Sequence, residues 1–223
     1  MPIPNPTRLF HITAIANLPD VFANAALLSR NMVLASGIGY ANIAHEGAQG
    51  ARAAKLVLNP PGGNVHDYVP FYFAPRSPML FAINGGRVQG CDLRQADIVH
   101  FETTIDLATR NGERFLFYDC NATLAYSNAY TNLEHLNKIA WDLITEQPQL
   151  DGYCQFWMDK PSDQKYVNRR EKRMAEFLVK SSVPLTAITR IGVINNVKML
   201  QVSKIVADHG LNIPTVAMAS WYF

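Results

Sequence analysis

Apolar and polar residues alternate along the chain in short stretches, a pattern typical of many small strands and helices. Short runs rich in β-branched and aromatic residues predict strands. These strands are expected at residues 9–12, 68–74, 98–102, 114–119, 177–179, 187–194 and 215–219. Apolar positions at helical spacing predict helices beginning at 17–20 and covering 75–83, 104–109, 133–144, 197–208 and part of 41–58. Strands and helices are mixed without strict alternation, which favours an α+β fold over a doubly wound parallel sheet.

Two stretches of this pattern carry further expectations. Pro70 interrupts the aromatic strand at 68–74, and because proline cannot donate to a ladder, this strand is expected at a sheet edge or at a bulge. Residues 147–168 show little periodicity and predict a long loop. Long irregular segments of this kind usually carry function.

Length and composition predict one globular domain over residues 1–223. Apolar residues make up 48% of the 223 residues and charged residues 17%, enough to bury a sizeable core. The formal net charge is only +2. A non-specific nucleic-acid binder would usually be more basic, so any contact with nucleic acid must come from a local patch.

The cysteines and the apolar runs predict a cytoplasmic protein that holds no metal. Cys91, Cys120 and Cys154 show no C-x-x-C spacing, and their odd, low number argues against a disulfide framework or a structural zinc site. The first eight residues contain three prolines and no apolar core of a signal peptide. No run approaches the roughly 18 apolar residues of a membrane-spanning helix.

Neither a Walker A sequence nor a G-x-G-x-x-G motif is present, so bound phosphates would need another kind of site. His66 and Asp67 are adjacent, and neighbours on an extended chain point to opposite faces, which favours a structural role at a strand start. His100 and Glu102 are spaced to share one strand face, but two ligands do not make a metal site.

The most informative charged stretch is residues 168–180, NRREKRMAEFLVK, in which five residues are Lys or Arg. Such a run is usually a solvated helix face. Glu176 departs from that interpretation, because it directly precedes the apolar run 177–179. A carboxylate there either points outward or has a chemical role, and the residues alone leave both interpretations open.

Four blocks of the sequence carry a resemblance to a known family. They are residues 10–13 (FHIT), 60–63 (PPGG), 66–80 (HDYVPFYFAPRSPML) and 175–179 (AEFLV). In this order they resemble the DarT family of DNA ADP-ribosyltransferase toxins, which belong to DarT–DarG toxin–antitoxin systems. The resemblance covers residues 9 to about 185, and the block at 66–80 is the most specific. The last part of the chain matches only in outline.

The resemblance implies an ADP-ribosyltransferase fold, a split mixed β-sheet with an NAD cleft similar to that of PARP enzymes. It places His11, Ile12 and Thr13 at the nicotinamide end of NAD, which is the substrate. It makes Arg52 and Glu176 catalytic, with Arg52 also contacting the cofactor. Arginine is a poor base because its pKa lies above about 12, so electrostatic orientation is the favoured role for Arg52. A surface arginine is the alternative.

For the second substrate, the resemblance implies contacts with DNA near Met79 and Asn121. The basic run Arg169, Arg170, Lys172 and Arg173 is placed to hold DNA phosphates, with the three arginines as the expected contacts. Candidates for stacking on an unpaired base, with core packing as the alternative, are Tyr72, Tyr118 and Tyr126. Single-stranded DNA is the expected substrate, because a duplex base must first be extruded.

The expected reaction is transfer of ADP-ribose from NAD to a base in single-stranded DNA, with thymine the first expectation and guanine the second. An RNA or protein acceptor is an alternative that keeps the fold. A catalytically silent NAD- or nucleic-acid-binding module is another. The presence of both Arg52 and Glu176 argues against a silent module. The resemblance also implies a macrodomain antitoxin, similar to DarG, as partner.

Overall fold

The centre of the molecule is an eight-stranded mixed β-sheet. The computed structural model describes residues 2–223, and the strand order is β12-β11-β4-β1-β3-β9-β5-β6. The strands are β1 Arg8–Ala14, β3 Tyr68–Tyr72, β4 Ile98–Thr104, β5 Phe115–Tyr118, β6 Ala129–Tyr130, β9 Glu176–Lys180, β11 Arg190–Val193 and β12 Thr215–Ala217. The β11–β12 pair is parallel and the other pairs are antiparallel.

The sheet splits between β1 and β3, and this split is the parting of the sheet. Along its whole length β1 pairs with β4, but its register with β3 is limited to Phe10↔Tyr72. On the far side, β3 pairs fully with β9, from Tyr68↔Lys180 to Tyr72↔Glu176. The backbone of β1 beyond Phe10 therefore has a free edge toward β3. This arrangement, with helices and strands mixed, confirms the predicted α+β class and the split mixed sheet.

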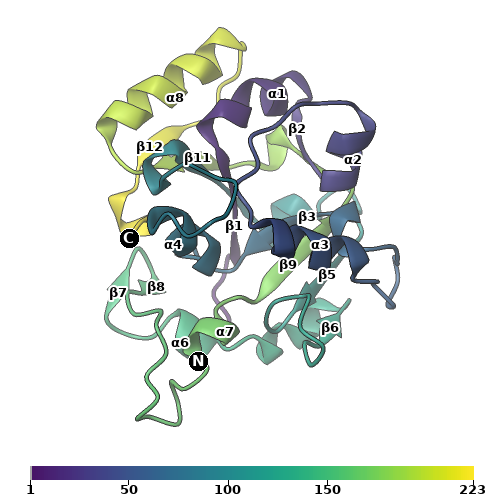
Figure 1. Cartoon of the computed structure of the whole chain (residues 1–223), viewed down its shortest axis with the longest axis vertical. Helices are drawn as coiled ribbons and strands as arrows, with labels where there is room; N and C mark the ends of the chain where they lie inside the picture. The colour runs from purple at the N-terminus through teal and green to yellow at the C-terminus, as the bar shows by residue number, and fades with distance from the viewer. Residues whose placement is uncertain (1) are drawn as a thin grey trace.

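Short helices and two small two-stranded sheets surround the central sheet (Figure 1). The helices are η1 Ile15–Asn17, α1 Leu18–Ala23, α2 Arg30–Ala35, α3 Glu46–Ala54, η2 Val65–Asp67, α4 Pro78–Asn84, η3 Gln95–Asp97, α5 Ile105–Ala108, η4 Leu133–Lys138, α6 Trp141–Ile144, α7 Arg169–Lys172, η5 Leu185–Ala187, α8 Asn196–Asp208 and η6 Ala219–Trp221. The small sheets pair β2 Ala26–Leu28 with β10 Ser182–Pro184, and β7 Gln149–Leu150 with β8 Tyr153–Cys154. In Figure 1, α8 lies at one end of the molecule beside β11 and β12, α6 and α7 lie toward the other end, and α3 crosses in front of the strands.

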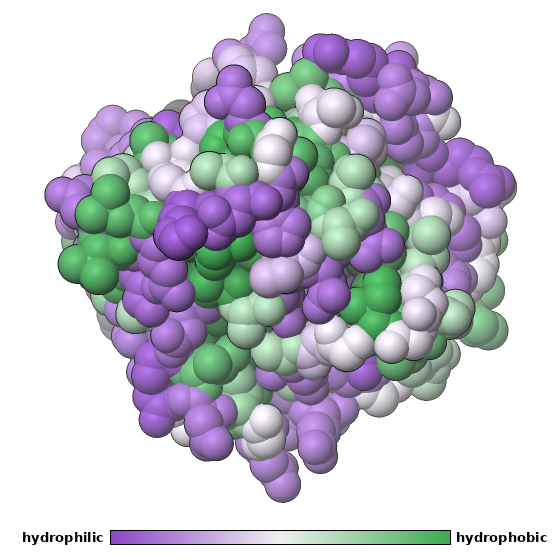
Figure 2. All heavy atoms as spheres, turned by 90° about the horizontal axis from the view of Figure 1, so that it is seen from above, coloured by the Kyte–Doolittle hydropathy of each residue, from purple (hydrophilic) through white to green (hydrophobic). Residues whose placement is uncertain are grey.

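Aromatic side chains fill much of the core. Phe73, just after β3, makes edge contacts with Phe117, Trp141 and Phe177, at centroid distances of 6.5, 5.4 and 6.3 Å. Rings of this size bury large apolar areas and favour such edge-to-face geometry. On the face shown in Figure 2, apolar side chains reach the surface in groups between polar ones. The strands that carry the site are thus fixed by a packed aromatic core.

The expectation that Pro70 marks a sheet edge or bulge was wrong, because β3 lies inside the sheet between β1 and β9. The Pro70 carbonyl faces the β1 side, where it bonds the His11 ring rather than backbone. The N and C=O of one residue in an antiparallel strand point to the same side. The missing N–H of Pro70 therefore faces the parting of the sheet, where no ladder bond is lost.

The expectation of one helix over 133–144 was also wrong. The segment forms η4 and α6, with Ile139 extended between them. Leu136, Ile139 and Trp141 are all buried, and spacings of three and two residues do not fit one face of a continuous helix. The Trp141 indole N–H donates to the Leu136 carbonyl at 2.7 Å and closes the break.

The other predicted strands and helices form where the sequence pattern indicates them, with shifted bounds. Residues 147–168 are irregular apart from the short β7–β8 hairpin, as predicted. Across residues 2–223, no helix combines the length and the apolar character that crossing a membrane requires.

Candidate active site

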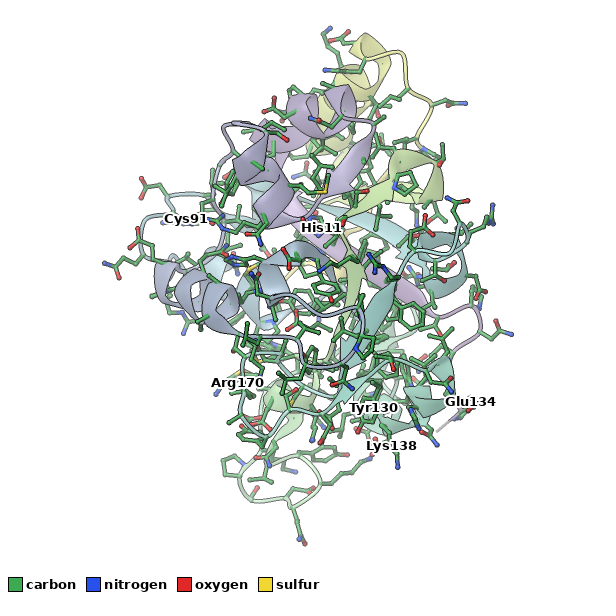
Figure 3. All side chains as sticks on the ribbon, turned by 90° about the vertical axis from the view of Figure 1, so that its right-hand side faces the viewer. His11, Cys91, Tyr130, Glu134, Lys138 and Arg170 are labelled. Atoms are coloured by element: carbon green, nitrogen blue, oxygen red, sulfur yellow. The ribbon has the colours of Figure 1, made fainter. Side chains whose placement is uncertain are left out.

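A cleft of about 440 Å³ is lined by residues from both sides of the parting between β1 and β3. Its volume suits a small-molecule ligand. Seven of the residues predicted for catalysis or binding line it: His11, Ile12, Thr13, Arg52, Met79, Asn121 and Glu176. They come from distant parts of the chain, so the fold brings together what the sequence separates. In Figure 3, His11 lies near the middle of the molecule, and Arg170, which does not line the cleft, lies well below it.

Glu176 is the buried carboxylate of the cleft. It is the first residue of β9, and its side chain is 4% exposed. The Ala122 N–H donates to Oε1 at 2.8 Å, and Nη1 of Arg52 donates to Oε2 at 2.9 Å and to Oε1 at 3.1 Å. A buried carboxylate needs donors and an opposite charge to replace water. Arg52 and Ala122 supply both, so Glu176 has the partners of an ionised carboxylate.

Two tyrosines flank Glu176 on the neighbouring strands, Tyr72 on β3 and Tyr118 on β5. Residues directly opposite each other in antiparallel strands share a face. Burial, and then the charge of Glu176, raise the pKa of both phenols. Tyr72 lines the cleft, whereas Tyr118 is buried outside its lining. The third stacking candidate, Tyr126, is exposed and donates its hydroxyl to Glu171 at 2.6 Å.

The hydrogen bond of His11 defines its tautomer. Nδ1 lies 2.8 Å from the Pro70 carbonyl oxygen. A carbonyl only accepts, so Nδ1 carries the proton and Nε2 is left as an acceptor. Burial lowers the pKa of His11, although the bond to Pro70 opposes the change, and the ring is therefore neutral at neutral pH. From β1, His11 can accept a hydrogen bond from a ligand hydroxyl.

Asn17 connects β1 to the loop that contains Ala41, beside the His11 end of the cleft. Its Nδ2 donates to Thr13 Oγ1 and to the Ala41 carbonyl, each at 3.0 Å, and its Oδ1 accepts from Ala41 N–H at 2.7 Å. The sequence pattern indicates Asn17 only as part of a helix start. It precedes α1, but its backbone is helical and its side chain makes no capping bond. All three residues line the cleft, and Asn17 fixes two of its walls to each other.

Arg30 is the second arginine in the lining of the cleft. Its guanidinium carbon lies 5.0 Å from the centre of the Tyr40 ring, a cation–π contact. Burial lowers the pKa of Arg30. Within the described residues, Nη1 is buried without a hydrogen-bond partner and no ion pair includes this side chain. No sequence signal identifies it, since Arg30 follows an ordinary helix N-cap, Ser29.

Asn121 and Met79 line the cleft beside Glu176 and Arg52. The Asn121 Oδ1 accepts from Thr123 N–H at 2.9 Å and from the Thr123 hydroxyl at 2.7 Å. These two bonds close a local turn, occupy the side-chain oxygen of Asn121 and leave its side-chain N–H groups as donors. The same turn presents the adjacent Ala122 N–H to Glu176. Asn121 therefore supports the geometry of the carboxylate in addition to the DNA contact predicted for it.

The three arginines predicted to hold DNA phosphates have different environments. Arg170 is exposed at the surface and pairs loosely with Asp159, at 3.6 Å. Arg169 is buried against Tyr166 and pairs with Glu146 at 3.4 Å. Arg173 is buried as well, and its Nη1 donates to the Leu143 carbonyl at 3.0 Å. Burial lowers the pKa of Arg173 to about 10. Of the three side chains, Arg170 alone is accessible to a phosphate in this structure.

His100 and the three cysteines lie outside the cleft lining and are buried in the interior. His100 is fully buried and contacts the Pro75 carbonyl at 3.0 Å. Cys91, Cys120 and Cys154 are free and buried. In the part of the chain that the structure describes, no group of three or more His, Cys, Asp or Glu side chains is placed to hold a metal ion.

Comparison with known proteins gives consistent matches over nearly the whole chain. Residues 10–223 match the family model described as "ssDNA thymidine ADP-ribosyltransferase, DarT". The DNA ADP-ribosyl transferase of Thermus sp. (strain 2.9) is 36% identical over 192 residues, which are 85% of this chain and 82% of the relative.

Two solved structures of the Thermus sp. 2.9 DarT have the same fold. The complex with ADP-ribosylated ssDNA has a TM-score of 0.87 and 32% identity, covering 100% of this chain and 99% of that one. The complex with NAD+ has a TM-score of 0.83 and 31% identity, covering 100% of both chains. These matches confirm the resemblance seen in the sequence and the predicted fold.

Proposed function

This chain belongs to the DarT family of single-stranded DNA thymidine ADP-ribosyltransferases, and we propose that it transfers ADP-ribose from NAD to thymine in single-stranded DNA, releasing nicotinamide. The observation that carries the proposal is the Arg52–Glu176 pair, buried in a cleft beside His11 and the free edge of β1. The Thermus sp. 2.9 DarT, which shares the fold, has been solved with NAD+ and with ADP-ribosylated ssDNA.

The chemistry assigns Glu176 the central role. The bond between the ribose C1′ and the nicotinamide nitrogen breaks, nicotinamide leaves with the electron pair, and positive charge develops on the ribose. A carboxylate held close to that charge stabilises it. A ring nitrogen of the base then bonds to C1′ and loses its proton, for which Glu176 is the acceptor in the cleft. Arg52 holds the carboxylate in place for both steps.

The nicotinamide end of NAD is assigned to β1. His11 Nε2 accepts from a ribose hydroxyl, since the Pro70 carbonyl holds the proton on Nδ1. Beyond Phe10, β1 pairs on one side alone, and Ile12 and Thr13 line the cleft. Free backbone N–H and C=O groups are suited to the donor and acceptor atoms of a carboxamide.

Arg30 is assigned to the diphosphate of NAD. The lining contains two arginines and no lysine, and Arg52 is already paired with Glu176. A diphosphate needs cationic or N–H donors, and the chain has neither of the usual glycine-rich phosphate loops. The buried, unpartnered Nη1 of Arg30 supplies such a donor.

The DNA strand is assigned to the side of the cleft formed by Met79 and Asn121. The free amide N–H groups of Asn121 can donate to a carbonyl oxygen of the base. Arg170 is the exposed one of the three arginines in the basic run and is assigned to a backbone phosphate. We also propose a macrodomain antitoxin as partner, on the resemblance alone, and a cytoplasmic location, where NAD and DNA are both available.

The test uses labelled NAD and four single-stranded oligonucleotides, each lacking one base. Label transfer should fail only with the oligonucleotide that lacks thymine, and Glu176→Gln should abolish it. Glu171→Gln, which changes the partner of the exposed Tyr126, is the matched control and should retain transfer. If transfer instead requires guanine, the acceptor base is guanine and not thymine. Transfer to RNA or protein alone, or no NAD cleavage at all, would overturn the proposal.

A further inference from the structure

The helix that carries Arg52 is weakly attached to the rest of the molecule. None of the nine residues of α3 is buried. Helices this short are marginal alone, and Gly47 and Gly50 weaken α3 further. An unburied helix cannot be positioned by core packing, so polar contacts must fix it. The Arg52–Glu176 pair is one such contact, and Gln49 makes another. At the end of the helix, the Lys55 carbonyl accepts from Val65 N–H at 3.1 Å.

Gln49 connects α3 to His66. The His66 ring Nε2 lies 2.9 Å from Gln49 Oε1, and Gln49 Nε2 donates to Asn42 Oδ1 at 3.3 Å. The bond to Asn42 sets which end of the Gln49 amide faces His66. Because that end is the carbonyl oxygen, His66 is the donor and carries its proton on Nε2. Gln49 and Arg52 are three residues apart and therefore share one face of α3.

His66 itself is rigidly held. It is buried within η2, and its backbone N–H donates to Asn64 Oδ1 at 2.9 Å. Asn64 N–H in turn donates to Asp67 Oδ2 at 2.9 Å, which closes a capping box. Asn31 on α2 donates to Asp67 Oδ1 at 2.7 Å and ties this turn to its neighbour. The imidazole is thus a fixed point beside a helix that, within the described residues, is otherwise bonded to this turn only at its end, through Lys55.

The same turn is also connected to Glu176. Directly after η2, β3 begins, and its register with β9 ends at Tyr72↔Glu176. Glu176 is therefore placed by the β3–β9 ladder, and Arg52 by the His66–Gln49 bond on the preceding turn. The positions of Arg52 and Glu176 therefore both depend on the short stretch of chain that forms η2 and β3.

We propose that His66 is a positioning residue for the transfer reaction, whose Nε2–H bond to Gln49 holds α3 so that Arg52 meets Glu176. This inference rests on the proposed function of the cleft. The adjacent charges fit the role: Arg30, Arg52 and Asp67 face His66 from α2, α3 and its own turn. Burial, and then the two arginines, lower the pKa of His66 to about 4, so the ring is a neutral donor at neutral pH.

The test compares His66→Leu, which removes the donor, with His66→Gln, whose side-chain amide N–H restores one. A misplaced catalytic group costs up to about 100-fold. We expect His66→Leu to lower kcat about 10- to 100-fold with a smaller change in the KM for NAD. His66→Gln should stay within about threefold of the wild type. His135→Leu replaces an exposed histidine outside the cleft as the matched control.

A double-mutant cycle and hydrogen exchange separate positioning from a general structural role. His66→Leu and Gln49→Leu both break this bond, and Gln49→Leu also loses the bond to Asn42. The double variant should therefore be no worse than the more impaired single variant. Amides of α3 should exchange faster in His66→Leu, while those of β3 and β9 keep the wild-type rates. Additive losses, unchanged α3 exchange, or His66→Gln as impaired as His66→Leu would overturn the proposal. The exchange result does not depend on the acceptor, so it can fail independently of the proposed function.

Discussion

The central sheet contains two buried glutamates, Glu102 and Glu176. Their surroundings give the first a structural role and the second a chemical role. Glu102 on β4 forms ion pairs with Arg8 of β1 and Arg190 of β11. Its partners sit on adjacent strands, Arg190 in direct register with Glu102. Glu176 has one arginine, and this arginine comes from a helix that buries none of its residues. Glu176 also lines a cleft, whereas Glu102 does not.

The Glu102 cluster extends to the end of the chain. Arg8 also pairs with Asp151 at 2.8 Å, and the Trp221 indole donates to the same carboxylate at 2.8 Å. Burial alone would raise the pKa of Asp151, but the hydrogen bonds from Arg8 and Trp221 lower it below its usual value. A carboxylate surrounded by charges on rigid elements is held for stability. One that has a single arginine partner and lines an open cleft is placed for reaction.

The largest expected effect comes from removing the reactive carboxylate. Glu176→Gln keeps the shape and an acceptor for Ala122 N–H but removes the charge that stabilises the developing ribose cation. We expect nicotinamide release to fall about 100- to 1,000-fold, with little change in the unfolding transition. The measurement is the steady-state rate with saturating oligonucleotide and NAD. A rate within threefold of the wild type would remove Glu176 from the chemistry.

The complementary variant is Glu102→Gln. It removes one of the two carboxylates that pair with Arg8 and Arg190 and leaves Asp151 as their remaining partner. Breaking a buried pair typically costs about 3–5 kcal/mol. We expect a loss of up to that size in the free energy of unfolding, measured in urea, while kcat per folded molecule is unchanged. Glu113→Gln at the surface is the control. If Glu102→Gln were stable but inactive, Glu102 would have a chemical role, and the comparison would be contradicted.

A smaller effect is expected for Arg30→Gln. Losing a hydrogen bond to a charged group costs about tenfold or somewhat more in affinity, so the KM for NAD should rise by that factor with kcat nearly unchanged. Competition by ADP should weaken in parallel, and competition by adenosine should not. Arg110→Gln is the exposed control. Equal weakening of ADP and adenosine would place Arg30 away from the diphosphate.

The last effect is on stability against pH. His66 has a pKa of about 4 in the folded chain and an ordinary value of 6.5. Between these values the unfolded chain binds more protons, so the contribution of His66 to stability is present above pH 6.5 and is lost as the pH falls toward 4. His66→Gln lacks this loss. The difference between the two unfolding free energies should therefore change across that window, and parallel curves would contradict the assignment.

The sequence indicated most of the strands, because apolar periodicity reports which positions are buried. In the structure, the apolar positions of β4 and β9 are buried. It could not indicate that Pro70 lies inside the sheet, because the parting beside β3 is a tertiary feature. Nor could it show that 133–144 breaks in two, since that break depends on what Ile139 and Trp141 contact.

The candidate site was readable only through the family resemblance. Glu176 and Arg52 are 124 residues apart, and no spacing rule connects them. Glu102 and Glu176 both lie in apolar strands, so sequence alone does not tell the structural carboxylate from the reactive one. Arg30 and Asn17 occupy ordinary helix-start positions, and their roles depend on what faces them. The extent of the domain and the individual roles of the site residues stay predictions.

The most direct test of the central claim is mass spectrometry of a single-stranded oligonucleotide with one thymine, after incubation with NAD. Three proteins are compared: the wild type, Glu176→Gln and Glu102→Gln, the last at a temperature where it is folded. The account predicts one ADP-ribose on the thymine with the wild type and Glu102→Gln, and none with Glu176→Gln. Modification that persists in Glu176→Gln, or no modification of DNA by the wild type, would contradict it.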